Sequence, residues 1–167
     1  MKTRKGFTLI ELIVVIAIIG VLAAILVPSM LGYVKKSKIS SANDAAASVQ
    51  KAFNTALIEL DEAGELPADD DYHHDKNALV EIKSADEKDV LGKKIMNYMD
   101  AGKKVEFSAK VEGGVCVAVA ASPDGKYLGT YPAGVVTVDN FGSDKTYKAD
   151  SFTEALTAAY NKTKDKA

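Results

Sequence analysis

The chain has 167 residues, enough for one ordinary domain and an appendage, because domains typically run to about 100–150 residues. Its net charge is −2 and Arg4 is its one arginine, so it lacks the arginine forks and the basic face of a sequence-specific nucleic-acid reader. Its single cysteine, Cys116, excludes an intrachain disulfide and a multi-cysteine zinc site.

The N-terminal part of the chain is far more apolar than the average composition. A short basic segment, residues 1–6, precedes a run from Phe7 to Leu31 made almost wholly of Ile, Leu, Val and Ala. As a helix, this run is long enough to span the roughly 30 Å hydrocarbon core of a bilayer. We therefore expect residues 7–31 to be inserted in a membrane.

Beyond the apolar run the helix is predicted to continue as an amphipathic rod. Apolar side chains recur at near-helical spacing through residues 32–62, among Ser, Lys, Asn and Asp. Pro28 lacks an amide hydrogen and Gly32 adds backbone freedom, which predicts a bend or local melting there. Gly64 and Pro67 predict that the helix ends just before them.

Residues 63–167 are predicted to form a globular head. A loop through Asp75 comes first, followed by a short helix that starts near Ser84 or Asp86 and ends near Gly102.

Alternating apolar residues then predict an antiparallel meander. Its strands are expected at Val105–Val111, Val115–Ala121, Lys126–Tyr131 and Val135–Val138. Ser151 is the predicted cap of a C-terminal helix over Phe152–Lys162. Cys116 lies in the alternating run, which favours a small buried core residue over a reactive thiol. The predicted fold class is α+β, a long N-terminal helix packed on a small antiparallel sheet with a short C-terminal helix.

Glu11 is the one charged residue inside the apolar run. A carboxylate within a membrane helix costs about 2.5–3.5 kcal/mol and is usually paired or functional. Because Glu11 lies in the first turns, the helix dipole and the membrane interface offer partial compensation. Pairing with a charge outside the helix is the other interpretation.

Residues 5–20, Lys-Gly-Phe-Thr-Leu-Ile-Glu-Leu-Ile-Val-Val-Ile-Ala-Ile-Ile-Gly, closely resemble the N-terminal signature of the type IV pilins and pseudopilins. The resemblance implies that residues 1–6 are a leader peptide, which a prepilin peptidase cuts between Gly6 and Phe7. It also implies methylation of the new N-terminal residue, Phe7.

By the same resemblance, Glu11 meets the N-terminal amine of a neighbouring subunit during filament assembly, which would compensate its charge. Pro28 matches the family's helix-disrupting proline. Many pilins close their C-terminal region with a disulfide, which this chain cannot form, so packing is expected to hold that end.

The function that the resemblance implies is structural, with no enzymatic activity and no cofactor. The precursor would be a single-pass membrane protein, and the mature chain a subunit of a cell-surface pilus. The implied partners are copies of itself, the prepilin peptidase, an assembly ATPase with its inner-membrane platform, and membrane lipid before assembly, with no specific nucleic acid. Motility and adhesion, two roles of such filaments, are not separated by this signature.

Two alternatives stay open. One is a pseudopilin of a type II-like secretion or DNA-uptake system, which shares the same N-terminal chemistry. The other is a secreted or single-pass anchored binding domain, since a basic start and an apolar stretch also mark ordinary signal peptides.

Two acidic loops contain possible metal ligands. Asp69 to Asp75 offers carboxylates and imidazoles, and Asp139 to Asp144 offers carboxylate and amide oxygens. Neither spacing matches a standard site, so a solvated loop and ordinary turn chemistry are the favoured interpretations and no metal is expected. The only histidines lie in the first loop without a nucleophile motif nearby, which argues against catalysis.

Overall fold

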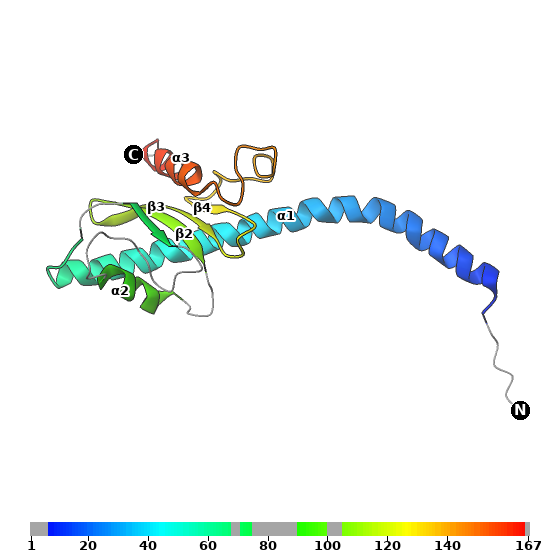
Figure 1. Ribbon diagram of the computed structural model, residues 1–167, viewed down its shortest axis with the longest axis horizontal. Coiled ribbons are helices and arrows are strands. Elements are labelled where there is room, and N and C mark those ends of the chain that lie inside the picture. Colours follow the sequence, from blue (N-terminus) through cyan, green and yellow to red (C-terminus); the bar gives the residue numbers. More distant parts are fainter. Residues whose placement is uncertain (1–6, 68–70, 75–89, 100–104, 166–167) are drawn as a thin grey trace, which may run out of the picture. The chain divides into compact units, whose positions relative to one another are not determined.

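A computed structural model describes residues 7–67, 71–74, 90–99 and 105–165. Its elements, in chain order, are α1 (Leu9–Glu62), β1 (Asp71–His74), α2 (Val90–Tyr98), β2 (Glu106–Glu112), β3 (Val115–Ser122), β4 (Gly129–Tyr131) and α3 (Phe152–Lys164) (Figure 1). The predicted α+β class is confirmed. The chain divides into two compact units, one ending at Lys35 and the other beginning at Lys36.

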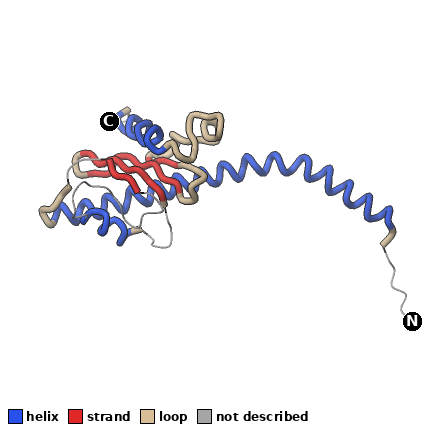
Figure 2. Tube along the Cα trace, in the orientation of Figure 1, coloured by secondary structure: helices blue, strands red, loops and turns tan. Residues whose placement is uncertain are grey.

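The helix α1 is assigned without interruption through Pro28 and Gly32, where the sequence predicts a bend or local melting (Figure 2). Pro28 has no amide hydrogen to donate to the carbonyl of Ala24. At the next residue, the Ser29 hydroxyl donates to the carbonyl of Leu26 at 2.8 Å. Melting is therefore not observed in this unit, and the backbone stays helical through Pro28 despite the missing hydrogen bond.

The end of α1 is fixed by the glycine that the sequence singles out. Gly64 has φ 70°, a conformation that favours glycine. The amide of Glu65 donates to the carbonyl of Leu60 at 2.8 Å, and the amide of Gly64 donates to that of Asp61 at 3.0 Å. These two bonds form a Schellman motif, which satisfies carbonyls that the helix end leaves open.

The described strands form one antiparallel sheet in the order β1-β2-β3-β4. The predicted loop through Asp75 contains β1, so that prediction is wrong. β1 pairs with β2, with Asp71 opposite Lys110 and His74 opposite Phe107. Its sequence, Asp-Tyr-His-His, has none of the apolar alternation that marks a strand, so only the pairing with β2 identifies it.

The sheet lies between α1 and α3, and each of its faces carries one apolar cluster (Figure 1). Alternate residues of β2 pack toward α1, where the Phe107 ring meets Phe53 edge-on with centroids 5.7 Å apart. On the other face, Ala118 and Ala120 of β3 belong to the cluster that contains Leu156 of α3. The prediction that packing holds the C-terminal region is thus consistent with the buried side of α3.

Three amide side chains of α1 bind the backbone of the sheet. Asn43 Oδ1 accepts a hydrogen bond from the Thr130 amide at 2.8 Å. Two turns further along, Gln50 Nε2 donates to the carbonyl of Cys116 at 3.3 Å. Asn54 Oδ1 accepts from the amide of Cys116 at 2.8 Å. These bonds fix the rotation and the axial position of this part of α1 against the sheet.

Cys116 is buried, as the alternating pattern predicts. Burial raises the pKa of its thiol to about 12, because a thiolate would lose its hydration there. The thiol is therefore protonated at neutral pH and has the character of a small apolar core residue.

Two predictions in the C-terminal part of the chain are wrong. Val135–Val138 is not a strand, because the Asn140 side chain takes its backbone groups, accepting from the Thr137 amide at 2.7 Å and donating to the Val135 carbonyl at 2.8 Å. Ser151 precedes α3, but its side chain makes no capping bond and instead accepts from the Lys148 amide at 3.0 Å. β4 is also shorter than the predicted Lys126–Tyr131.

The second helix is confirmed as α2, while Ser84, Asp86 and Gly102 lie outside the described residues. Lys94 Nζ lies 2.8 Å from Glu59 Oε2 of α1, and the Tyr98 hydroxyl donates to the other oxygen of the same carboxylate. Leu91 and Ile95 contribute to the buried cluster on the α1 side of the sheet.

Gly129 is where β4 passes closest to α1, and it gives the first test of this fold. A Cβ at Gly129 would lie 2.2 Å from the Ala42 carbonyl carbon, so Gly129→Ala forces backbone apart. In a fragment beginning at Gly32, which keeps every buried residue of the described core, we expect Gly129→Ala to lower the free energy of unfolding by about 3 kcal/mol. Urea denaturation followed by circular dichroism measures it.

The matched control is Ser143→Ala, an exposed loop position, which should change stability by less than about 0.5 kcal/mol. Equal effects of the two substitutions would contradict the close packing at Gly129. If the fragment fails to fold, the expectation that residues 32–167 fold without the apolar segment is wrong.

Candidate functional site

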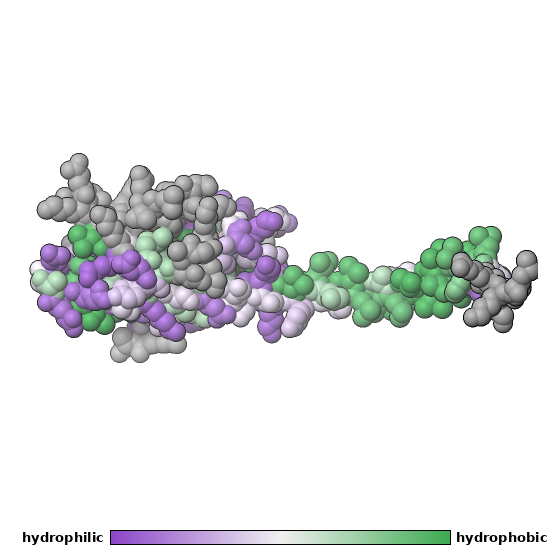
Figure 3. Space-filling view, turned by 90° about the horizontal axis from the view of Figure 1, so that it is seen from below, coloured by the Kyte–Doolittle hydropathy of each residue, from purple (hydrophilic) through white to green (hydrophobic). Residues whose placement is uncertain are grey.

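The N-terminal part of α1 presents apolar side chains on every side. From Phe7 to Val34 every residue is exposed, and Phe7 itself is 84% exposed. Figure 3 shows the apolar surface continuing along this stretch. Within the described residues, α1 is the one helix long and apolar enough to cross a membrane, by length and composition. An apolar surface of this size calls for lipid or protein around it.

Glu11 and Thr8 form a reciprocal cap at the start of α1. Glu11 Oε2 accepts hydrogen bonds from the Thr8 amide at 2.8 Å and from the Thr8 hydroxyl at 2.7 Å. The Thr8 oxygen accepts in turn from the Glu11 amide at 3.3 Å. This is the capping box, in which a Thr and a Glu three residues later satisfy amides that the helix start leaves open.

The cap uses only one of the two carboxylate oxygens. Both bonds from Thr8 go to Oε2, and Oε1 of Glu11 has no partner among the described residues. A carboxylate can accept about four hydrogen bonds, so Glu11 keeps the capacity to receive a further donor or a positive charge. The arrangement therefore reduces the cost of the carboxylate in the apolar helix and leaves it able to bind a partner.

Thr8 is the site residue that the sequence reasoning missed. The spacing Thr-x-x-Glu immediately before an apolar run is a recognised start signal for a helix and is visible in the sequence. Of the residues implied by resemblance, Phe7, Glu11 and Pro28 all lie in or beside the first half of α1, whereas Gly6 lies outside the described residues.

Neither acidic loop gains support as a metal site. No group of three or more potential ligands is found in the described part of the chain, which includes all of Asp139 to Asp144. In that loop the Asn140 side chain is already engaged by Thr137 and Val135. Of the loop Asp69 to Asp75, only the four residues of β1 are described.

Comparison with known proteins identifies the N-terminal segment. A family model described as the prokaryotic N-terminal methylation motif matches residues 1–27. The chain carries a type IV prepilin N-terminus. The resemblance to the type IV pilins is thereby confirmed for this segment.

Several fimbrial proteins and pilins are similar to part of the chain. A type IV major fimbrial protein of Dichelobacter nodosus is 44% identical over 62 residues, which cover 37% of this chain and 40% of that protein. A fimbrial protein of Pseudomonas aeruginosa is 39% identical over 74 residues, 43% of this chain and 48% of its own length. A type IV major alpha-pilin of Moraxella bovis is 48% identical over 59 residues, covering 35% and 37%.

The chain thus spans less than half the length of these curated relatives. No solved structure matches it significantly. The family model covers residues 1–27, and each of these relatives matches less than half of the chain.

The cap of the prepilin segment can be tested through Thr8. Thr8→Ala removes the hydroxyl that donates to Glu11 and accepts from its amide, and losing such a cap costs about 0.5–2 kcal/mol. We expect faster hydrogen exchange at the Glu11 amide, by about fivefold, in detergent micelles, measured by NMR. Thr8→Ser keeps the hydroxyl and should exchange like the parent chain, and an unchanged rate in Thr8→Ala would contradict the cap.

Proposed function

We propose that the chain is a pilin, the structural subunit of a type IV pilus, which polymerises through residues 7–31 after cleavage between Gly6 and Phe7. The observation that carries the proposal is the exposed apolar first part of α1, residues 7–34, with one capped carboxylate, Glu11. The fimbrial and pilin names of the relatives support a pilus subunit over a pseudopilin.

Assembly exchanges lipid for protein around the apolar helix. The precursor stores residues 7–31 in the bilayer as a single-pass anchor, and in the filament the same side chains meet neighbouring copies. Since lipid tails are as apolar as leucine, this exchange gains little from the hydrophobic effect, and close packing and polar contacts must favour the filament. Glu11 has the one charged side chain of the segment that can provide such a contact.

The proposed partner of Glu11 is the N-terminal amine of Phe7 in a neighbouring copy. Cleavage creates this amine four residues before the carboxylate, and methylation leaves an amine able to carry a positive charge. The free Oε1 can receive it without breaking the bonds from Thr8. A paired charge is tolerated in an apolar core where a single charge is not, so the pairing would select one axial register between copies.

The other implied residues and partners belong to the same proposal. Pro28 is the helix-disrupting proline, whose missing hydrogen bond would allow α1 to bend or unwind locally in the filament. A prepilin peptidase cuts and methylates the chain, and an assembly ATPase acting through an inner-membrane platform supplies the work. The mature filament lies on the cell surface, and the role of the chain in it is structural and not enzymatic.

N-terminal mass spectrometry of the mature protein from its native host tests the processing. We expect a chain that begins at methylated Phe7. A start near Ala24 would indicate an ordinary signal peptide and a released domain, and an intact Met1 would indicate a plain membrane anchor, so either result would overturn the proposal.

The role of Glu11 is tested by separating its charge from its cap. Glu11→Ala should leave membrane insertion intact and reduce the yield of sheared filaments by tenfold or more, on the order expected for an unpaired buried charge partner. Glu11→Gln keeps a side chain that can accept from Thr8 and lacks the charge, so it should assemble as poorly. Normal filament yield from Glu11→Gln would show that the cap, and not charge pairing, is what assembly needs.

A further inference from the structure

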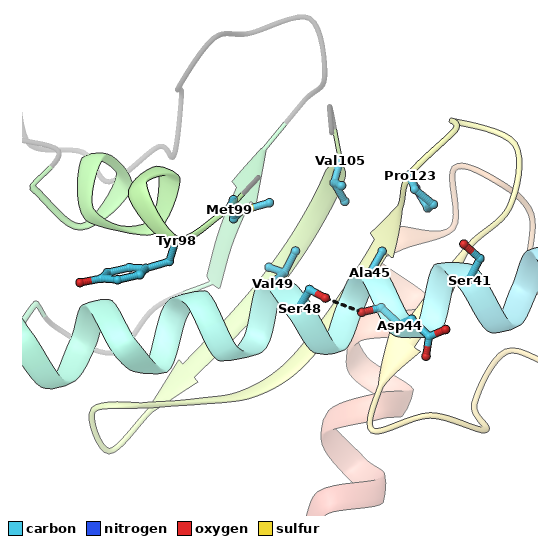
Figure 4. Close-up of a pocket in the computed structure, with 9 residues that line it drawn as sticks. All are labelled: Ser41, Asp44, Ala45, Ser48, Val49, Tyr98, Met99, Val105 and Pro123. Carbon is cyan, nitrogen blue, oxygen red and sulfur yellow. Dashed lines mark hydrogen bonds between the residues drawn. The ribbon is translucent and has the colours of Figure 1, made fainter. Parts of the chain in front are cut away.

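A groove of about 510 Å³ lies along the second half of α1, in the unit that begins at Lys36 (Figure 4). Its floor is α1, and its other walls come from the end of α2 and from the chain beside β2 and β3. Val49, Met99 and Pro123 make much of the lining apolar, while Asp44 and Ser48 are polar and lie on α1. The groove is therefore mainly apolar, with one carboxylate at its edge.

This lining suits an aliphatic chain that ends in a positive charge. Asp44 is exposed, and its carboxylate has no partner among the described residues. The Ser48 hydroxyl donates to the backbone carbonyl of Asp44 at 2.9 Å. This bond holds the Ser48 side chain in place, and its Oγ can still accept a hydrogen bond. A lysine side chain matches this combination, because its four-carbon stem packs on apolar surface while its ammonium takes three acceptors.

The outward face of α1 carries exposed charges of alternating sign. Lys36, Asp44, Lys51 and Glu62 follow one another within an arc of about 80° at 3.6 residues per turn, opposite the residues that pack on the sheet. All four lie in the unit that begins at Lys36. None of these side chains has a charged partner within the described residues.

The spacing of these charges is self-complementary for parallel copies. Asp44 follows Lys36 by eight residues, and Glu62 follows Lys51 by eleven, which correspond to about 12 and 16 Å along the helix. In both pairs the acid lies on the C-terminal side of the lysine. A second copy displaced along the axis by about 12–16 Å therefore places both lysines opposite both acids at once.

The same pairs cannot form within one chain. Side chains on a helix meet at separations of three or four residues, and eight residues place Lys36 and Asp44 about 12 Å apart along the axis. Within the described residues, the unpaired acid at the groove and the unpaired lysine can therefore meet only between molecules.

We propose that the groove receives Lys36 of a second, parallel copy of this chain, with Asp44 as its counter-charge and a Lys51 to Glu62 contact farther along α1. The inference rests on the proposed function, which supplies the parallel arrangement. The contact is heterologous, because the lysine and the acid sit on different parts of the face, and repetition of such a contact builds an open helical filament.

A charge exchange in the full-length chain in its native host tests the pairing. Asp44→Lys sets two lysines opposite each other, and we expect the yield of sheared filaments to fall about fivefold with an unchanged pool of membrane subunit. Lys36→Asp should act alike, and the double variant Asp44→Lys with Lys36→Asp should restore the yield. Lys145→Asp, an exposed change outside α1, is the matched control and should assemble normally.

Disulfide trapping tests the register directly. In filaments of Lys36→Cys with Asp44→Cys, mild oxidation should give a ladder of dimers, trimers and larger species on a non-reducing gel. Two Cys about 12 Å apart on one helix cannot bridge within a chain, because bridged Cα atoms lie within about 7 Å. Lys36→Cys with Lys51→Cys is the control with a mismatched register and should stay mainly monomeric, and buried Cys116 should not contribute.

Failure of this inference is distinguishable from failure of the proposed function. Normal filaments from Asp44→Lys, or well-formed filaments whose paired cysteines stay monomeric, would overturn the groove contact while leaving the pilin intact. Rescue of Asp44→Lys by Lys103→Asp or Lys104→Asp, and not by Lys36→Asp, would assign the groove an occupant from its own chain and likewise overturn it. Absence of filaments from the unmodified chain would contradict the proposed function itself.

Discussion

The carboxylate of Glu11 sets the constraint on which the rest of the molecule depends, because Glu11 is the one charged residue of the apolar segment, residues 7–31. Water would satisfy the carboxylate but not the apolar side chains around it, and lipid would satisfy those side chains but not the carboxylate. Thr8 resolves part of this conflict by donating two hydrogen bonds to Oε2. The remainder requires an apolar environment that also contains a donor, and an assembly of like helices with charged N-termini is such an environment.

The packing of the second half of α1 on the sheet fixes which of its residues are buried and which face outward. Its buried face uses small residues, with Ala42, Ala46, Ala52 and Ala56 among them, so that the sheet approaches the helix backbone closely. At Gly129 the approach leaves no room for a Cβ, and the adjacent Thr130 amide binds Asn43. Because these contacts fix the rotation of α1 about its axis, they also determine which residues point outward. The charged outer face is therefore a consequence of packing on the inner one.

The sequence was sufficient for elements whose burial follows a period, and insufficient where a particular hydrogen-bonding partner decides the backbone conformation. The start and end of α1, the strands β2 and β3 and the helix α3 follow from apolar spacing, from Gly64 and from the turn residues. β1 could not be found, because Asp-Tyr-His-His carries no apolar alternation and its strand character comes from pairing with β2. Residues Val135–Val138 have the alternation but not the strand, since Asn140 occupies their backbone groups. In the candidate site, Glu11 was evident as an isolated charge, whereas the use of a single carboxylate oxygen by Thr8 is a matter of geometry.

Near Lys35 and Lys36, α1 changes from an apolar to an amphipathic helix. This change links the two proposed polar contacts, that of Glu11 and that between Lys36 and Asp44. Lysines that follow an apolar helix lie where the headgroups of a bilayer begin, and anionic lipid phosphates attract them. A subunit that leaves the bilayer loses this attraction at its lysines, as it loses its lipid neighbours along residues 7–31. If Asp44 of the next copy receives Lys36, and the Phe7 amine of a neighbour reaches Glu11, Lys36 exchanges its lipid partner for Asp44 and Glu11 gains a positive partner. Under the proposed function, extraction from the membrane would then carry no net loss of ion pairs at either end of the apolar segment, and packing and the assembly machinery would decide between membrane and filament.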